Sequence, residues 1–500
     1  MQGVEAGRAP AFDRRVVAVA AAVFAVLMAL SSRYGFQRDE VYFLDCARHL
    51  QPGYVDQGVL GPLLARVSLD LFGVWLPGLR VWPASAAALT VVVGALTARE
   101  FGGARRVQLL TAVATATMPA LLASGHIANT TPDNLLAWAL LALVVARVGR
   151  TGDVRWWVPA GAVLGIGWDN NHLVGWFAVA LVTGIALGPG RRTLGNRWFV
   201  AGALLAAVLM APDVGWQATH GWPSAAMTAA LNARNGGPLN AVAWVVGQAL
   251  MVSPVLAWVW VAGLRWLWRS GNPLWRALVW AYGLSFVAFA ATTGAQVYYL
   301  AGIYPGLLGA GFVALDGWLH ARRRRVPVLG VATAAATAVF LPSLLPVLPP
   351  SSVRTTGSAV LAETIGWPEL VTSVHRAWTA IPPDRRARAV IFTADYSEAG
   401  ALNELGRGSG LPTAVSGQNN EWYWGPGMPD ATTVLAVSPG PDAAGDFAAD
   451  LREHFAEVRR VGTLTNPYGV RNIEWGGALY LCTGPREPWA RMWPQLRHVE

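Results

Sequence analysis

The stretch RRVVAVAAAVFAVLMALSSRYGFQRDE, residues 14–40, sets two arginines, a long apolar run and a charged triplet in succession. The apolar run Val16–Ser32 approaches the roughly 20 residues that cross the hydrocarbon core of a bilayer. Arginines ahead of such a run are typical of a helix that enters the membrane from the cytoplasm. We therefore expect an uncleaved first membrane helix, with Arg38-Asp39-Glu40 emerging on the far side.

The same pattern recurs along two thirds of the chain. Only 13% of the 500 residues are charged and the mean hydropathy is +0.38, whereas a typical soluble domain has about 25% charged residues. The sequence therefore predicts a polytopic α-helical membrane protein with about eleven transmembrane helices. The expected spans are Val16–Ser32, Val81–Ala98, Val107–Ala123, Leu135–Val148, Trp156–Trp168, Leu173–Leu187, Trp198–Ala211, Ala241–Trp268, Leu274–Ala291, Tyr298–Leu319 and Val326–Val347.

The basic residues orient this bundle. All 38 of them are arginines, and they gather in alternate loops, such as Arg99–Arg106, Arg147–Arg155 and Arg322–Arg325, while the short loops around Asn129 and Asn171 have none. This asymmetry predicts a multi-pass protein of the inner (plasma) membrane with a cytoplasmic N-terminus and an extracytoplasmic C-terminal domain. Because topology accounts for the net charge of +9, we expect no nucleic-acid partner.

The first outer loop, residues 33–80, departs from the arginine pattern. It carries five arginines and five acids, so it is more than a simple connector. Within it, Val59–Phe72 has an apolar stripe at helical spacing, and this predicts an amphipathic helix lying in the membrane interface. The stripe is formed by Leu63, Leu64, Val67 and Leu71.

The composition changes after Val347, where prolines and charges replace the apolar runs. We expect a membrane domain at residues 1–348 and a soluble extracytoplasmic domain at 349–500. Ala389–Thr393, Thr433–Val437 and Ala478–Leu481 have the composition of short buried strands, and the segment from the 440s to Val458 that of a helix. Strands that alternate with helices predict a small α/β domain.

Four polar islands interrupt the apolar chain on the predicted outer side: Arg38–Glu40, Gly125–Asn134, Trp168–His172 and Gln296–Tyr299. Each has a simpler explanation, as a helix cap or part of an interfacial aromatic belt. Ionisable groups at membrane depth are costly and tend to line functional cavities. Since all four islands fall on one side, we expect them to share a cavity.

Several short motifs resemble one bacterial glycosyltransferase family. It is the branch similar to protein O-mannosyltransferases and to the lipid A aminoarabinose transferase. The resemblance covers nearly the whole chain and rests on the order of the motifs. They are Arg38–Leu44 (RDEVYFL), Gly53–Gln57 (GYVDQ), Pro62–Arg66 (PLLAR), Thr131–Asp133, Trp222–Pro223, Tyr298–Leu300, Tyr304–Pro305 and Asp395–Ala401 (DYSEAGA).

This resemblance implies a GT-C fold and an enzyme that moves a sugar from a polyprenyl-phosphate donor to an extracytoplasmic glycan, lipid or protein. By position, it makes Asp39 the catalytic base, with Glu40 beside it and Asp133 as a second acid that shapes the site. An acceptor hydroxyl needs such a base as it attacks the anomeric carbon. A transporter or flippase of a lipid-linked sugar, and a non-catalytic scaffold of the same fold, remain the alternatives.

The leaving phosphate needs cations or hydrogen-bond donors. Relatives tend to have lysine near the positions of Asn171 and Gln296, and Asp-Gln-Pro-Pro-Leu where this chain has Asp56–Leu60; here every lysine is absent. We therefore expect arginines or histidines to take the phosphate. The candidates for donor and phosphate binding are Arg38, Asp56, Gln57, Arg66, His126, His172, Arg234, Gln296, Tyr298 and Tyr299.

In the C-terminal domain, Glu398, Asn420 and Trp422 are candidates for acceptor binding, because amides, acids and aromatic rings suit the faces of sugars. The alternative is an ordinary polar rim on a folded cap. The sequence has no cluster with metal-ligand spacing and no glycine-rich nucleotide loop after a strand. No cofactor is expected, and the sequence does not decide whether a metal is needed.

Overall fold

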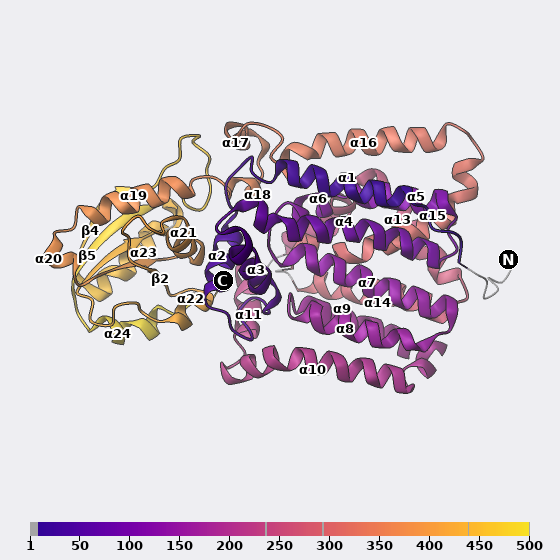
Figure 1. The fold of residues 1–500 in the computed structure, drawn as a ribbon, viewed down its shortest axis with the longest axis horizontal. Coiled ribbons are helices and arrows are strands. Elements are labelled where there is room, and N and C mark those ends of the chain that lie inside the picture. The colour runs from indigo at the N-terminus through magenta and orange to yellow at the C-terminus, as the bar shows by residue number, and fades with distance from the viewer. Residues whose placement is uncertain (1–8, 236–237, 293–294, 439, 500) are drawn as a thin grey trace.

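Two regions of different build lie end to end along the long axis of the molecule (Figure 1). The computed structural model describes residues 9–235, 238–292, 295–438 and 440–499. Long helices form the N-terminal region, and a five-stranded sheet with flanking helices forms the C-terminal region. The predicted helical membrane class and C-terminal α/β region are therefore confirmed.

Each of the apolar segments predicted from the sequence is helical. Two of them, Val107–Ala123 and Ala241–Trp268, are each divided between two helices. The helices of the bundle are α1 (Arg15–Leu30), α4 (Leu76–Glu100), α5 (Arg105–Ala116), α6 (Pro119–Gly125), α7 (Thr130–Thr151), α8 (Trp157–Trp168), α9 (Leu173–Ala186), α10 (Arg197–Thr219), α12 (Pro238–Val252), α13 (Ala257–Arg269), α14 (Pro273–Ala291), the 3₁₀ turn η4 (Val297–Ile303) with α15 (Tyr304–His320), and α16 (Arg325–Leu344).

Within the described residues, six helices are long and apolar enough to cross a membrane, or up to eight if each bent pair counts as one span. The bent pairs are α5 with α6, at 60°, and α12 with α13, at 86°. Pro119 and Pro254 follow the two breaks, where proline lacks the N–H that would continue the preceding helix. Helices α1, α9 and α8, of 16, 14 and 12 residues, are shorter. Length and composition thus support fewer spans than the eleven predicted.

A buried ion pair fixes the start of the first outer loop. Arg80, on α4, donates two hydrogen bonds of 2.8 Å to the carboxylate of Glu40, and the two side chains are 1% and 0% exposed. Arg80 also donates to the carbonyls of Ser31 and Gly35. Glu40 in turn accepts from the backbone N–H of Ala128, just before α7. The pair therefore ties together α1, α2, α4 and the loop before α7.

Two helices occupy the loop of residues 33–80. Helix α2 (Arg38–Arg48) begins in a capping box, in which the Gln37 side chain accepts from the backbone of α2 and Glu40 accepts from the Gln37 N–H. Helix α3 (Leu60–Phe72) confirms the helix predicted there. Leu63 and Leu71 are 43% and 66% exposed, so part of the apolar stripe is uncovered. This exposure suits the interfacial position that the sequence predicts.

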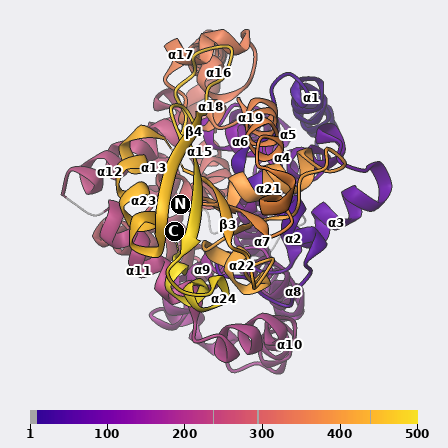
Figure 2. The ribbon, with the colours of Figure 1, turned by 90° about the vertical axis from the view of Figure 1, so that its left-hand side faces the viewer.

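The C-terminal sheet has the strand order β2-β1-β3-β5-β4. The strands are β1 (Ala389–Thr393), β2 (Ala414–Ser416), β3 (Thr433–Val437), β4 (Phe455–Thr463) and β5 (Ala478–Pro485). The central β1–β3 pair is parallel, and β5 runs antiparallel to both β3 and β4. Helices α19 (Trp367–Thr379) and α21 (Tyr396–Leu405) cover one face, and α23 (Pro441–His454) covers the other (Figure 2).

Three strands were predicted correctly, but β2 and β4 were missed. The helix expected to reach Val458 ends at His454, and β4 begins at Phe455. Most of β4 is exposed, because it is an edge strand with a charged sequence. Strand β4 therefore lacks the alternation and the apolar content that mark a buried strand in the sequence.

The two regions are joined by close packing of α2 against α21. A methyl group added at Gly400 would lie 2.7 Å from the carbonyl oxygen of Val41, so only glycine fits there. Arg48 forms an ion pair of 2.8 Å with the buried Glu404, and Asn403 donates to Asp45 at 2.6 Å. These contacts fix the C-terminal region against the beginning of the first outer loop.

We expect Glu40→Gln to destabilise the protein by about 3–5 kcal/mol, because it leaves Arg80 buried without a counter-charge. Thermal unfolding of the purified protein in detergent measures the effect. Arg66→Met is the matched control, since Arg66 pairs with Asp70 on the exposed surface, where an ion pair contributes about 0–1 kcal/mol. Equal shifts in the two variants would contradict the structural role given to the Arg80–Glu40 pair.

Candidate functional site

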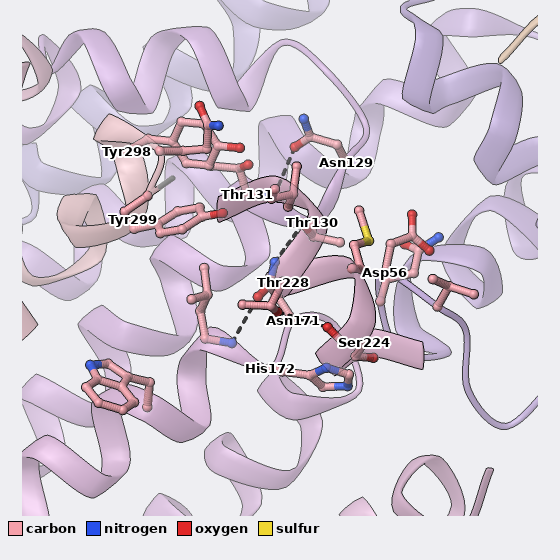
Figure 3. A pocket seen from close by; sticks show the side chains of 18 of the residues that line it. Asp56, Asn129, Thr130, Thr131, Asn171, His172, Ser224, Thr228, Tyr298 and Tyr299 are labelled. Carbon is pink, nitrogen blue, oxygen red and sulfur yellow. Dashed lines mark hydrogen bonds between the residues drawn. The ribbon is translucent and has the colours of Figure 1, made fainter. Parts of the chain in front are cut away.

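A cavity of about 580 Å³ lies where α2, α11 (Pro223–Asn235) and the ends of α7, α9 and α14 converge (Figure 3). We call it the central cavity. All four polar islands contribute to its wall. Its polar and charged lining consists of Asp39, Asp56, Gln57, Asn129, Thr130, Thr131, Asn171, His172, Ser224, Thr228, Asn232, Thr292 and Gln296, with Tyr298, Tyr299 and Tyr396.

Another part of the wall is apolar. Leu173 and Trp176 come from α9, Met227 and Leu231 from α11, and Phe289 from α14. Trp176 is 45% exposed, so this part reaches the outer surface of the helical bundle. The central cavity therefore joins a polar pocket to an apolar surface.

Asp39 lies in the first turn of α2, on the wall of the central cavity. The hydroxyl of Tyr396, from α21 of the C-terminal region, donates to Asp39 Oδ1 at 3.0 Å. Burial raises the pKa of Asp39, although the positive charge of Arg38 and hydrogen bonds from Tyr396 and Asn129 oppose that shift. A carboxylate with a raised pKa is a better proton acceptor than an ordinary aspartate.

Asp56 is the second carboxyl on the wall, and a rigid loop holds it. Asn420 accepts a hydrogen bond of 2.6 Å from the Val55 N–H, and Gln217 donates to the carbonyl of Tyr54 at 2.7 Å. Gly58 packs against the backbone of Asp169, which leaves no room for a side chain. Burial, with the nearby charge of Asp39, raises the pKa of Asp56 to about 7.

The segment between α8 and α9 supplies the opposite wall. The side-chain amide N–H of Asn171 donates to the hydroxyl of Thr130 at 3.0 Å, and its side-chain oxygen accepts from the backbone N–H of Leu173 (Figure 3). His172 precedes α9 and contacts Asp213 through Nε2 at 2.9 Å. Among the described side chains, His172 is the only one on the wall that can carry a positive charge.

Seven predicted site residues line the central cavity: Asp39, Asp56, Gln57, His172, Gln296, Tyr298 and Tyr299. Glu40 does not line it, because its carboxylate is buried against Arg80. His126 is also buried, with Nε2 lying 3.1 Å from Arg80. Asp133 is in the first turn of α7 but is not part of the wall.

The predicted arginines are placed differently. Arg38 forms an ion pair of 2.9 Å with Asp395, and its guanidinium lies 4.9 Å from the ring centre of Tyr396. Arg66 pairs with Asp70 on the exposed side of α3. Neither is on the wall of the central cavity. Arg234 belongs to α11, but its side chain lies outside the described residues.

The acceptor candidates of the C-terminal region have structural contacts instead. Glu398 is fully buried and closes the capping box of α21. Asn420 is also fully buried and holds the loop that carries Asp56. Trp422 donates its indole N–H to the carbonyl of Trp493. The structure does not bring these three residues to the central cavity: Glu398 and Trp422 serve the packing of their own region, and Asn420 joins that region to the loop of Asp56.

Two important residues were not among the predicted site residues. Tyr396 lies in the Asp395–Ala401 motif, and its distance from Asp39 in the sequence conceals their contact. Asp213 was overlooked, although an acid in the apolar sequence of α10 is a signal of function. Its carboxylate is fully buried.

The comparisons with known proteins agree with this geometry. Residues 56–216 match the sequence family described as dolichyl-phosphate-mannose-protein mannosyltransferase. The fold is similar to that of ArnT from Cupriavidus metallidurans, solved with undecaprenyl phosphate: the TM-score is 0.60 at 16% identity, over 93% of this chain and 97% of that one. The apo form of ArnT matches over the same shares, with a TM-score of 0.60 at 15% identity.

Part of the chain therefore matches a mannosyltransferase family, and its fold is similar to that of ArnT, in agreement with the resemblance inferred from its motifs. Arabinofuranosyltransferase AftD from Mycobacteria has a similar fold, with a TM-score of 0.53 at 16% identity over 95% of this chain and 40% of that one. No curated protein matches the sequence.

The carboxyls of Glu398 and Glu474 are buried together, and their burial makes the stability of this protein depend on pH. Burial and the proximity of Glu474 raise the pKa of Glu398, and burial raises the pKa of Glu474 to about 7. The folded state therefore holds protons that the unfolded state releases. Stability is full below the ordinary glutamate pKa, 4.5, and declines as the pH rises through about 7.

We expect Glu474→Gln to reduce the fall in melting temperature between about pH 5 and about pH 8, because one of the two titrating carboxyls is removed. Thermal unfolding of both proteins across this range measures the difference. Glu453→Gln, at an exposed position of the same region, is the control and should fall as the wild type does. The same pH dependence in all three proteins would show that the pair does not share protons as described.

Proposed function

We propose that this protein is an integral membrane glycosyltransferase that moves a sugar from a polyprenyl-phosphate donor to an acceptor outside the cytoplasm, with Asp39 as the base. The observation that carries the proposal is the position of Asp39. Its carboxylate lies on the wall of a cavity that is polar at one part and apolar at another, within a GT-C fold. A sugar phosphate joined to a long hydrocarbon chain is likewise polar at one end and apolar at the other.

The reaction follows from the residues on the wall. A hydroxyl of the acceptor attacks the anomeric carbon of the donor sugar, and Asp39 takes the hydroxyl proton as the new glycosidic bond forms. The bond between the anomeric carbon and the phosphate oxygen breaks, and its electron pair stays with the polyprenyl phosphate. Donors such as His172, Asn171 and Thr228 then face the phosphate, where charge accumulates.

The raised pKa of Asp39 fits a base that works near neutral pH. Asp56 lies on the same wall with a pKa of about 7, and it suits a role in holding sugar hydroxyls. Glu40 is assigned a structural role, because its carboxylate is already occupied by Arg80 and two backbone N–H groups. Asp133 is not assigned to the chemistry, since it is not on the wall.

The proposed orientation places the central cavity on the extracytoplasmic side. The arginine-rich loops before α5 and α16 lie at the ends of those helices remote from the sheet (Figure 1). Since such loops favour the cytoplasm, the C-terminal region is assigned to the opposite side of the plasma membrane. The acceptor then reaches Asp39 from outside, where Tyr396 marks the border between the two regions.

We expect Asp39→Asn to lower transfer by about a hundredfold or more, the usual loss when a general base is removed. Mass spectrometry of cell-envelope glycans and glycolipids, from cells lacking the protein and complemented with each variant, identifies the product and measures it. Asp70→Asn, at an exposed position of α3, is the matched control at equal protein levels. An unchanged product in cells carrying Asp39→Asn would exclude Asp39 as the base.

We expect Tyr396→Phe to move the acidic limb of the rate profile to higher pH. The Tyr396 hydrogen bond lowers the pKa of Asp39, so its loss raises that pKa further and keeps the base protonated at pH values where the wild type is active. Initial rates in isolated membranes across a pH series measure the shift, and Asp56→Asn separates the contribution of the second carboxyl. An acidic limb unchanged by Tyr396→Phe would show that Asp39 does not set it.

A further inference from the structure

A buried acid stands behind the histidine of the central cavity. Asp213, on α10, is fully buried, whereas 23% of the His172 side chain is accessible. Asp213 Oδ2 accepts from the indole N–H of Trp168 at 2.8 Å and lies 2.9 Å from His172 Nε2. Its other oxygen, Oδ1, is buried without a hydrogen-bond partner. A methyl group added at Gly53 would lie 2.6 Å from Oδ1, so the backbone closes this side.

The surroundings of Asp213 fix the orientation of the His172 ring. A carboxylate away from water is strongly destabilised unless a cation pairs with it. In the described part of the chain, His172 is the only residue that forms an ion pair with Asp213. A protonated imidazole has two N–H groups. Nε2–H is directed to Asp213, and Nδ1, which has no hydrogen bond among the described residues, remains for a ligand.

The position of His172 directs its ring into the central cavity. His172 immediately precedes α9, a helix of 14 residues, whose N-terminal end carries a partial positive charge. The ring of Trp168 lies 4.6 Å from the imidazole, centre to centre, and holds it from behind. Asn171 and Thr130 lie beside it on the wall with further polar groups. A histidine N–H, a helix N-terminus and side-chain donors together suit an anion.

We propose that Asp213 and His172 form a dyad that recognises the phosphate of the lipid donor, in a cavity where the described side chains include no arginine and the sequence offers no lysine. This inference rests on the proposed function for the identity of the donor. His172 contacts the phosphate. Asp213 is a positioning residue, which holds the imidazole turned toward the cavity.

Other charges also act on His172. Asp169 lies in the same segment between α8 and α9, and Asp56 faces it from the first outer loop; both carboxyls interact electrostatically with the imidazole.

The test measures the binding of undecaprenyl phosphate, and of the neutral alcohol undecaprenol, to the full-length protein in lipid nanodiscs. We expect Asp213→Asn and His172→Gln each to raise the Kd for undecaprenyl phosphate about tenfold or more and to leave that for undecaprenol unchanged. The double variant should bind no more weakly than His172→Gln, because the two residues act as a unit.

The controls use a second histidine–aspartate pair, His320 and Asp316, whose side chains are 34% and 21% exposed. His320→Gln and Asp316→Asn should bind both lipids as the wild type does. If Asp213→Asn fails to fold, the Kd of the His172→Gln protein alone tests the dyad. The His172 side chain is partly accessible, so its replacement leaves no cavity in the packing.

Two results would overturn the dyad. One is an unchanged Kd for undecaprenyl phosphate in a folded His172→Gln or Asp213→Asn protein. The other is an equal weakening for undecaprenyl phosphate and undecaprenol, which shows a structural role. In both cases the donor class stands, because the wild type binds the lipid phosphate. A wild-type protein that binds no undecaprenyl phosphate would contradict the donor class in the proposed function and, with it, the phosphate role of the dyad.

Discussion

The buried ion pair of Arg80 and Glu40 is the constraint on which the rest of the site depends. Its charges are satisfied completely, by each other and by backbone groups of three further segments. Such a pair is costly to bury and is retained where it enforces one arrangement. Here it fixes the beginning of α2. Because successive residues of a helix are about 100° apart around its axis, anchoring Glu40 in the protein interior turns Asp39 toward the central cavity.

The site is completed from the other end of the chain. Helix α21 packs on α2 so closely that Gly400 has no room for a side chain, and this contact brings Tyr396 to Asp39. Arg38 reinforces the junction through Asp395. The C-terminal region is thus more than a cap on a helical bundle, since it contributes a hydrogen bond to the proposed base. Its own buried acids, Glu398 and Glu474, make the stability of the protein depend on pH.

Much of the fold was predictable because apolar runs and buried strands leave a local signal. Every predicted span is helical, and Ala389–Thr393 and Thr433–Val437 are strands with the predicted boundaries. The bends before Pro119 and Pro254 were missed, since a proline within an apolar run does not by itself separate a kinked span from two helices. The edge strand β4 was missed because its exposed residues lack a buried pattern.

The candidate site was predictable only in part, for a physical reason. The four polar islands do meet, as expected from their common side of the membrane. What the sequence does not reveal is which charged groups are already paired. Glu40, Arg38 and Arg66 are residue types that suit a site, yet each is paired with a partner that is distant in the sequence or lies on the surface. Asp213 is the opposite case, because its proposed role depends on His172, which lies 41 residues earlier in the chain.

The contact between Tyr396 and Asp39 also has a consequence for the life of the chain. A ribosome makes Asp39 near the start of synthesis and Tyr396 some hundreds of residues later, so the two can meet only after the chain has been made through α21. A chain that ends before Tyr396 carries the acid but lacks the hydroxyl, and its α2 lacks the surface of α21. Such a chain therefore has no complete site of the kind proposed.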